Sequence, residues 1–161
     1  TLPDATAPQP VHRLDYATTR ILLVGKTSTS IRKLNKLFED KAITKTYYAI
    51  TIGEMEDDGT ISLPIDDKPS TSHYRKIDSS PSDRFGVLNL IELRPETGRR
   101  HQLRIHLAKI GNPILGDKAY GTEGLILNGK GLYLHAHCLN FQHPETRERT
   151  HLVDDLPSRF K

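Results

Sequence analysis

Residues 97–109, TGRRHQLRIHLAK, gather positive charge and contain no acidic residue. Arg99, Arg100 and His101 stand where a helix is expected to begin, and cations there face the positive end of the helix dipole. The same helix end, combined with guanidinium groups, is a good binding site for phosphate. The segment therefore indicates an anion site, with a solvated basic surface as an equal alternative.

Arg104 lies on the same expected helix, at the border of the apolar positions Leu103 and Leu107. An unpaired buried charge is costly, so Arg104 is expected to pair with a carboxylate. That carboxylate can belong to a structural ion pair, which is the commoner case, or to a reaction centre.

Asp15 closes the tetrapeptide HRLD and precedes the turn-like YATT. An Asp in this setting is most often a cap or turn residue. The tetrapeptide by itself therefore does not identify a nucleophile.

Tyr47 and Tyr48 are adjacent on an expected strand, so their side chains face opposite sides. Core packing is the favoured role for such rings. One of the two can instead contact a ligand, because nucleic-acid-binding proteins stack bases on aromatic side chains.

His135 and His137 would share one face of a strand and could bind zinc. The sequence supplies no convincing third ligand. A zinc hydrolase therefore stays a minor alternative.

The elements that must position these residues are mostly strands joined by short turns. Helices are expected over 29–41 and from a Thr97 cap to the stop at Gly111 and Pro113. Strands are expected at 20–27, 44–53, 60–65, 73–78, 87–95 and 131–141, with a last short one before residue 153 and a turn at 79–86. This order predicts one α+β domain over 1–161, with a mixed, mainly antiparallel sheet flanked by a few helices. Residues 1–10, with three Pro, are expected to be irregular.

The composition sets wide limits. Lys and Arg number 23 against 20 Asp and Glu, an excess too small to establish a nucleic-acid partner. Cys138 has no second Cys for a disulfide and fits a reducing cytosol. No apolar run approaches the ~20 residues that span a bilayer. Because the chain begins with Thr, it is expected to lack its natural beginning.

Four segments in order resemble the RluA-type pseudouridine synthases. They are HRLDYATTRILLVGKT, KTYYAITIG, RPETGRRHQLRIHLAKIGNPILGDKAYG and LHAHCLNFQHP, and they cover the chain from Val11 to about Pro144. The family pattern is H-R-L-D, then K-x-Y, then T-G-R-x-H-Q-[IL]-R-x-H-[LM], then G-x-P-I-x-G-D-x-x-Y-G. The chain departs from it at Arg20, where the family usually has Gly.

The resemblance implies the catalytic fold and the chemistry of this family. Asp15 would be the nucleophile that attacks the target uridine at the ribose C1′ or at the base. Tyr47 would pack on the uracil and take the C5 proton, and Arg104 would pair with Asp15. Arg13 would hold the flipped nucleotide or fill its gap, and His12, Arg99, Arg100 and His101 would contact the RNA.

The same resemblance implies the partners. The substrate would be a structured ribosomal or transfer RNA, and neither metal nor cofactor would be needed. The protein would be a cytoplasmic monomer that binds neither DNA nor membrane. Family members usually carry further strands upstream and often an S4-like domain, which fits an N-terminally incomplete chain.

Overall fold

The computed structural model describes residues 5–10, 18 and 21–160. In this part of the chain the elements are β1 (Ala5–Pro10), β2 (Val24–Thr27), α1 (Ser28–Glu39), β3 (Thr44–Ile52), β4 (Asp58–Ile61), β5 (Ser72–Ser82), β6 (Gly86–Pro95), α2 (Gln102–Lys109), β7 (Leu134–Gln142), β8 (Arg149–Val153) and the 3₁₀ turn η1 (Ser158–Phe160). Neither helix of this described part is long and apolar enough to cross a membrane.

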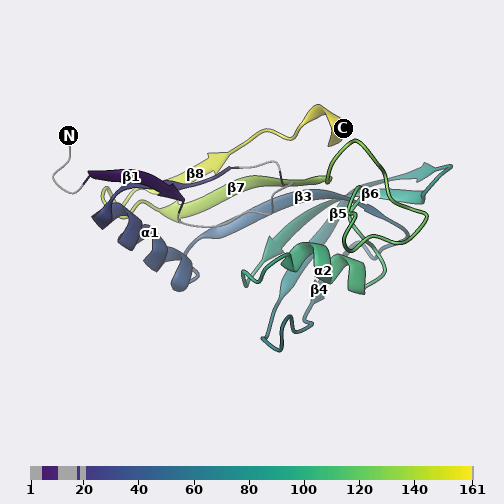
Figure 1. The fold of residues 1–161 in the computed structure, drawn as a ribbon, viewed down its shortest axis with the longest axis horizontal. Coiled ribbons are helices and arrows are strands. Elements are labelled where there is room, and N and C mark those ends of the chain that lie inside the picture. Colours follow the sequence, from purple (N-terminus) through teal and green to yellow (C-terminus); the bar gives the residue numbers. More distant parts are fainter. Residues whose placement is uncertain (1–4, 11–17, 19–20, 161) are drawn as a thin grey trace.

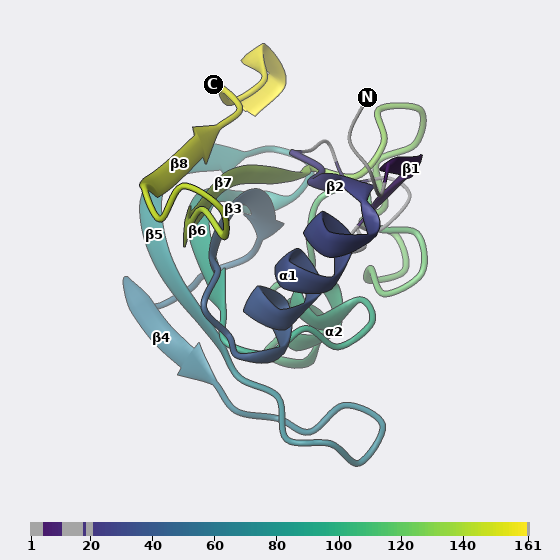
Figure 2. The same ribbon diagram turned by 90° about the vertical axis from the view of Figure 1, so that its left-hand side faces the viewer.

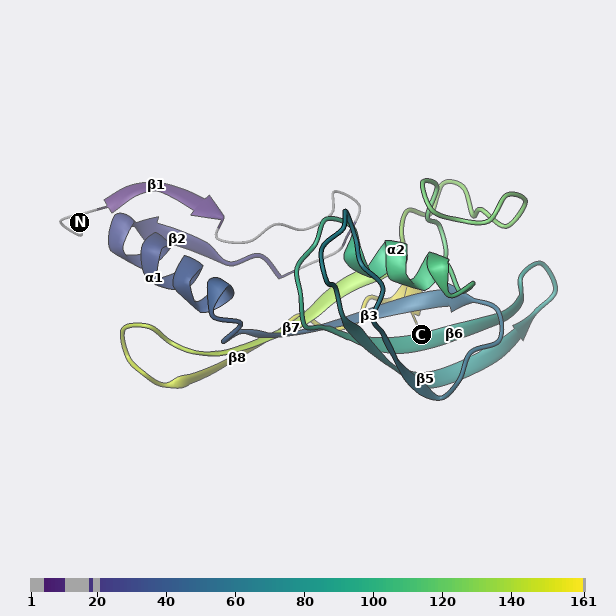
Figure 3. The ribbon, with the colours of Figure 1, turned by 90° about the horizontal axis from the view of Figure 1, so that it is seen from below.

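Six strands form one sheet in the order β4-β5-β6-β3-β7-β8, and every neighbouring pair is antiparallel. β1 and β2 form a separate antiparallel pair beside α1. Both helices lie against the same face of the large sheet, α1 near β7 and β8 and α2 nearer to β3 and β4 (Figures 1 and 2). Seen from below, the two helices stand apart along this face (Figure 3). The predicted α+β class is confirmed.

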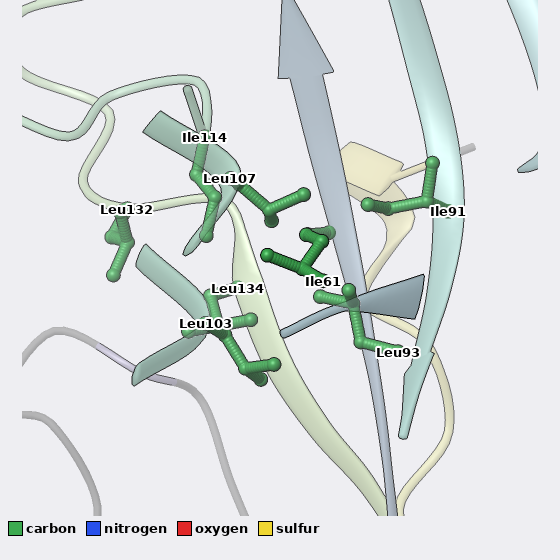
Figure 4. Packing of buried hydrophobic residues seen from close by; sticks show 9 residues of the cluster. Ile61, Ile91, Leu93, Leu103, Leu107, Ile114, Leu132 and Leu134 are labelled. Carbon is green, nitrogen blue, oxygen red and sulfur yellow. The ribbon is translucent and has the colours of Figure 1, made fainter. Parts of the chain in front are cut away.

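The space between helices and sheet is filled by two apolar clusters. The larger joins β3, β4, β6 and β7 to α2 and contains Ala49, Ile61, Ile91, Leu93, Leu103, Leu107, Ile114, Leu132 and Leu134 (Figure 4). The smaller lies under α1 and contains Leu34, Ile43, Leu139 and Phe141. Leu107 is completely buried, so α2 is fixed firmly to the sheet.

α1 and β3 were predicted closely. Thr27 caps α1, because its Oγ1 accepts a hydrogen bond from the Ser30 amide at 2.9 Å. The strand expected at 20–27 is shorter and begins at Val24. Ile21 and Leu23 are partly buried against the smaller cluster, and the Ile21 amide donates to the Ala136 carbonyl at 3.2 Å, which accounts for the apolar run before β2.

Two expectations for the strands were wrong. Ala5–Pro10 form β1 rather than an irregular segment, and its prolines stand on a strand of a two-stranded pair, where Pro is tolerated. The turn expected at 79–86 is confined to 83–85, because β5 continues to Ser82. Pro81 fits this strand because β4 pairs only with residues 72–75, which leaves the end of β5 at an edge.

The start of the second helix was also wrong. α2 begins at Gln102, and its N-cap is His101 in the left-handed region (φ 56°, ψ 24°). Thr97 does not cap it, because its hydroxyl donates to Gln102 Oε1 at 2.6 Å and accepts from the Thr71 amide. Arg99 and Arg100 therefore lie on a loop before the helix.

Candidate active site

A cavity of about 770 Å³ opens on the helix-bearing face of the sheet. Its walls come from the end of α1, from β3 and from the loop that precedes α2. Three of the predicted site residues, Tyr47, Arg99 and His101, line it, and so does Thr18. Its volume is in the usual range for small-ligand sites.

Tyr47 reaches the cavity because of its place on β3. It stands opposite Leu93 on β6 and Ala136 on β7, both of which are buried, so its ring leaves the strand toward the core. The ring packs against the larger apolar cluster. Tyr48 faces the other side, where its hydroxyl donates to Glu92 at 3.2 Å. The prediction that the two rings face opposite sides is confirmed, and Tyr47 is the one that both packs on the core and lines the cavity.

Gln102 holds the loop that carries the basic residues. Its Oε1 accepts from the Thr97 hydroxyl and from the Arg99 amide at 3.1 Å, and its Nε2 donates to the Thr71 carbonyl and to Ser72 Oγ. Gln102 is buried, its bond to Ser72 Oγ forms away from water, and its other three bonds are partly buried.

The same network continues to His106, which is completely buried. His106 Nε2 donates to the Leu63 carbonyl at 2.8 Å, and Nδ1 accepts from the Ser72 hydroxyl at 2.8 Å. This ring therefore fixes the base of the loop and makes no contact with the cavity.

The loop presents its cations differently. The side chain of Arg99 is half-buried and donates from Nη2 to the Pro69 carbonyl at 3.0 Å, while its buried Nε has no hydrogen-bond partner among the described residues. His101 Nδ1 lies 2.8 Å from the Tyr120 hydroxyl. Arg100 is exposed and does not line the cavity.

Arg104 forms a bidentate ion pair with Asp117. Its Nε and Nη2 donate to Asp117 Oδ2 and Oδ1, each at 2.9 Å, and the two side chains are 13% and 1% exposed. Its guanidinium also lies 5.0 Å from the centre of the Tyr120 ring. Arg104 therefore has the carboxylate partner that the sequence led us to expect. With Asp117 it forms a structural ion pair.

The charge of Asp117 is set by opposing effects. Burial works to raise the pKa of its carboxyl, but the Arg104 hydrogen bonds and the Tyr120 and Ala119 amides outweigh it, and the pKa is lowered. Asp117 is therefore ionised at neutral pH and holds Arg104 in place.

Asp15, His12 and Arg13 lie outside the described residues, so their predicted roles stay predictions. Thr18 is the nearest described residue that follows them, and it is buried in the cavity wall.

The two histidines of the zinc alternative, His135 and His137, share one backbone hydrogen-bond partner. His135 Nε2 and His137 Nδ1 both donate to the Asp154 carbonyl at 2.8 Å. Across residues 5–10, 18 and 21–160, no group of three His, Cys, Asp or Glu side chains is placed to hold a metal ion.

Two residues around the site were not singled out from the sequence. Asp117 stands in the GDKAYG segment, and only its ion pair with Arg104 reveals its task. Lys45 is the first residue of KTY and lines the cavity beside Tyr47. Its spacing of two from Tyr47 on a strand was the available signal.

Residues 2–109 match the family described as RNA pseudouridylate synthase. The match covers well over half of the chain.

The chain belongs to this family.

Curated pseudouridine synthases from bacteria resemble the chain over most of its length. An RNA pseudouridine synthase of Chloroflexus aurantiacus is 33% identical over 92% of this chain and 50% of that protein. The ribosomal large subunit pseudouridine synthase D of Vibrio parahaemolyticus is 34% identical over 91% of this chain and 52% of its own length. The dual-specificity RNA pseudouridine synthase RluA of the same organism is 33% identical over 86% of this chain and 62% of its own length. The chain thus spans about half the length of the first two.

Solved pseudouridylate synthase domains share the fold. Human RNA pseudouridylate synthase domain containing 1 superposes with a TM-score of 0.81 at 25% identity, over 92% of this chain and 69% of that one. Human RNA pseudouridylate synthase domain containing 4 gives a TM-score of 0.77 at 25% identity, over 97% of this chain and 74% of that one. The pseudouridine synthase catalytic fold predicted from the motifs is therefore confirmed.

Proposed function

We propose that the protein converts uridines in structured RNA to pseudouridine. The observation that carries this proposal is the meeting of three distant segments at one cavity: Thr18, Tyr47, and the loop with Arg99 and His101. Membership of the RNA pseudouridylate synthase family supports the reaction.

Asp15 is the proposed nucleophile. It precedes Thr18 by three residues, so chain connectivity keeps the two Cα atoms within about 11 Å of each other. The target nucleotide leaves its stack to enter the cavity, and Arg13 holds it or fills the gap it leaves. Tyr47 lies against the uracil ring and takes the C5 proton.

Arg104 is the proposed partner of Asp15. A guanidinium carries five N–H donors, so its bidentate pair with Asp117 is compatible with a second carboxylate. Such a partner keeps the nucleophile ionised and oriented. Asp117 then acts through Arg104 as a positioning residue.

His12, Arg99, Arg100 and His101 are the proposed contacts to the RNA backbone. The unpartnered Nε of Arg99 supports this role, because a buried donor beside a cavity is satisfied by an incoming acceptor such as phosphate. Contacts of this kind are independent of base sequence and weaken with salt.

Ribosomal or transfer RNA, rather than DNA, is the proposed substrate. The name of the Vibrio relative refers to the large ribosomal subunit. Uridine and pseudouridine are isomers, so the reaction needs no redox cofactor. We place the protein in the cytoplasm, as a monomer, in keeping with its lone thiol.

The test uses the protein expressed from its complete gene and RNA from cells that lack this gene. Release of tritium from uridine labelled at C5 is expected for the wild type and is abolished in Asp15→Ala, which still binds RNA. Turnover by Asp15→Ala would contradict the role of Asp15. RNA binding by the wild type without tritium release would instead identify a binding module.

A further inference from the structure

Lys45 occupies a place in the cavity that the roles above leave unused. It precedes Tyr47 by two residues on β3, so both side chains leave the strand on one face, about 7 Å apart along it. Their cross-strand partners on β7, Leu139 and Ala136, are both buried, which places both side chains on the core side. Lys45 therefore borders the position of a ring that stacks on Tyr47.

The ammonium group of Lys45 reaches the loop before α2. An ideal Cβ built on Gly98 would lie 3.7 Å from Lys45 Nζ, and Gly98 also lines the cavity. Any side chain at position 98 would approach this amine, whereas glycine leaves the space beside it open. The amine thus stands between the floor of the cavity and the loop that carries Arg99.

No anion neutralises this ammonium within the described part of the chain. Two carboxylates, Glu39 and Glu96, line the cavity, but neither forms an ion pair with Lys45, and Glu96 instead meets His73 Nε2 at 2.7 Å. No described group accepts a hydrogen bond from Nζ, and burial lowers the pKa of the amine. A half-buried cation of this kind gains free energy from an anion that enters beside it.

We propose that Lys45 Nζ donates a hydrogen bond to a carbonyl oxygen of the target uracil and stabilises the negative charge that the ring carries during its transfer. This inference rests on the proposed function and assigns a further catalytic residue to the same site.

The charge arises whichever atom Asp15 attacks. Attack at C1′ forms a bond from Asp15 Oδ to C1′ and breaks N1–C1′, and the electron pair of the broken bond stays on the uracil as an anion shared with O2 and O4. Attack at C6 instead forms a bond from Asp15 Oδ to C6 and moves the C5–C6 π pair onto O4, after which N1–C1′ breaks and its electron pair stays on N1. In both cases a cation beside a carbonyl oxygen lowers the barrier.

The remaining steps restore neutrality. C5 forms the new bond to C1′, the Asp15 carboxylate leaves with its bonding pair, the C5 proton passes to Tyr47, and N1 gains a proton. No atom is gained or lost overall. Lys45 keeps its proton throughout and acts only by hydrogen bonding and charge.

The position of Lys45 favours the base over the RNA backbone as its partner. Arg100, on the loop before α2, is exposed and suited to contact phosphates of the RNA backbone. Lys45 instead lines the cavity from β3, the strand that also carries Tyr47. A group on the same strand face as Tyr47 is suited to contact a base that packs on the Tyr47 ring.

The test measures kcat and KM for Lys45→Met, Lys45→Arg and the control Lys26→Met, in the protein expressed from its complete gene. Lys26 is exposed on β2 and does not line the cavity, so its replacement leaves kcat unchanged. Lys45→Met is expected to lower kcat about 10²–10³-fold, as does the loss of one donor to a developing oxyanion, with KM within threefold of the wild type. Lys45→Arg is expected to recover at least tenfold of this loss.

A substrate with 5-fluorouridine at the target separates Lys45 from Tyr47. With fluorine at C5 there is no proton to remove, so transfer of the ring is scored alone, by mass spectrometry of the digested RNA. Tyr47→Phe is expected to rearrange this substrate at near the wild-type rate, and Lys45→Met is expected to be slow.

Three results would overturn the inference. Unchanged kcat in folded Lys45→Met, or a raised KM alone, would remove Lys45 from the chemical step. Equal losses in Lys45→Arg and Lys45→Met would show that charge is not what matters. Absence of any tritium release by the wild type would remove the proposed function itself, and the inference with it.

Discussion

Replacement of Asp117 by Asn tests the ion pair that fixes Arg104. The carboxylate accepts two bonds from Arg104 and one each from the Ala119 and Tyr120 amides. Asn keeps one oxygen for the amides but turns an NH₂ group toward the guanidinium. The variant thus leaves a cation that is only 13% exposed facing a donor.

The expected loss follows from the burial of the pair. Removal of one partner of a buried ion pair costs about 3–5 kcal/mol, and the oxygen that Asn retains places this variant near 3 kcal/mol. For a domain of this size about 1 kcal/mol corresponds to 2–4 °C, so the Tm is expected to fall by about 6–12 °C. The exposed pair of Lys36 and Asp40 supplies the control, and Asp40→Asn is expected to cost less than about 1 kcal/mol.

The loss also has a defined dependence on pH. The pKa of Asp117 is lower in the folded protein than its ordinary value of 3.8, so below that value the unfolded chain binds more protons than the folded one. The stabilisation by the carboxylate is complete above pH 4 and is lost as the pH falls through the folded pKa. The difference in the free energy of unfolding between wild type and Asp117→Asn should therefore be constant from pH 7 to 5 and shrink below pH 4.

Urea denaturation followed by circular dichroism, at pH 7, 5 and 3.5, measures the loss of unfolding free energy and its dependence on pH. A loss below 1 kcal/mol at pH 7 would refute the buried ion pair. A gap that stays constant down to pH 3.5 would refute the assignment of the effect to the charge of Asp117.

Three further expectations concern the cavity and its loop. Arg99→Gln should weaken binding to RNAs of any sequence and reduce the slope of log K against log salt by about 0.7–0.9, measured by fluorescence anisotropy. Gln102→Leu should cost about 2–4 kcal/mol in urea denaturation, because it removes the partner of the partly buried Arg99 amide and Thr71 carbonyl and of the buried Ser72 hydroxyl. Lys45→Met should raise the free energy of unfolding at pH 7. This gain should shrink as the pH rises from the folded pKa of Lys45 toward 10.5, where the wild-type amine loses its proton in both states.

Elements with strong local signals were predictable from the sequence. The β-branched and aromatic run at 44–53 became β3, and the helix expected over 29–41 became α1. The opposite orientation of Tyr47 and Tyr48 also followed from alternation, but which of the two points inward became clear only from their buried neighbours in the sheet. These features depend on contacts that lie near in the chain or repeat with a fixed period.

Other features depend on contacts that a local pattern does not contain. The Thr97 hydroxyl could have capped the helix, but it donates instead to the side-chain Oε1 of Gln102. The partner of Arg104 lies on a loop thirteen residues further on, and no periodicity links the two. The family resemblance predicts a catalytic role for Arg104, while only the fold reveals that Asp117 holds its side chain.

Which residues of β7 are buried could not be predicted from strict alternation. Leu134 and Ala136 occupy even positions, whereas Leu139 and Phe141 occupy odd ones, so strict alternation would send one pair to solvent. The register with β3 resolves this conflict: Thr46 pairs with Cys138 and Tyr47 with Ala136, so His137 is an extra residue in a bulge.

Because of this bulge, one strand buries its residues under both helices. Leu134 lies in the larger cluster with α2, and Leu139 and Phe141 lie in the smaller one with α1. The shift falls between Lys45 and Tyr47 on the neighbouring strand, where the wall of the cavity passes from the end of α1 to the loop before α2. The bulge in β7 thus keeps both apolar clusters intact, while alternation along β3 places Lys45 and Tyr47 on one face.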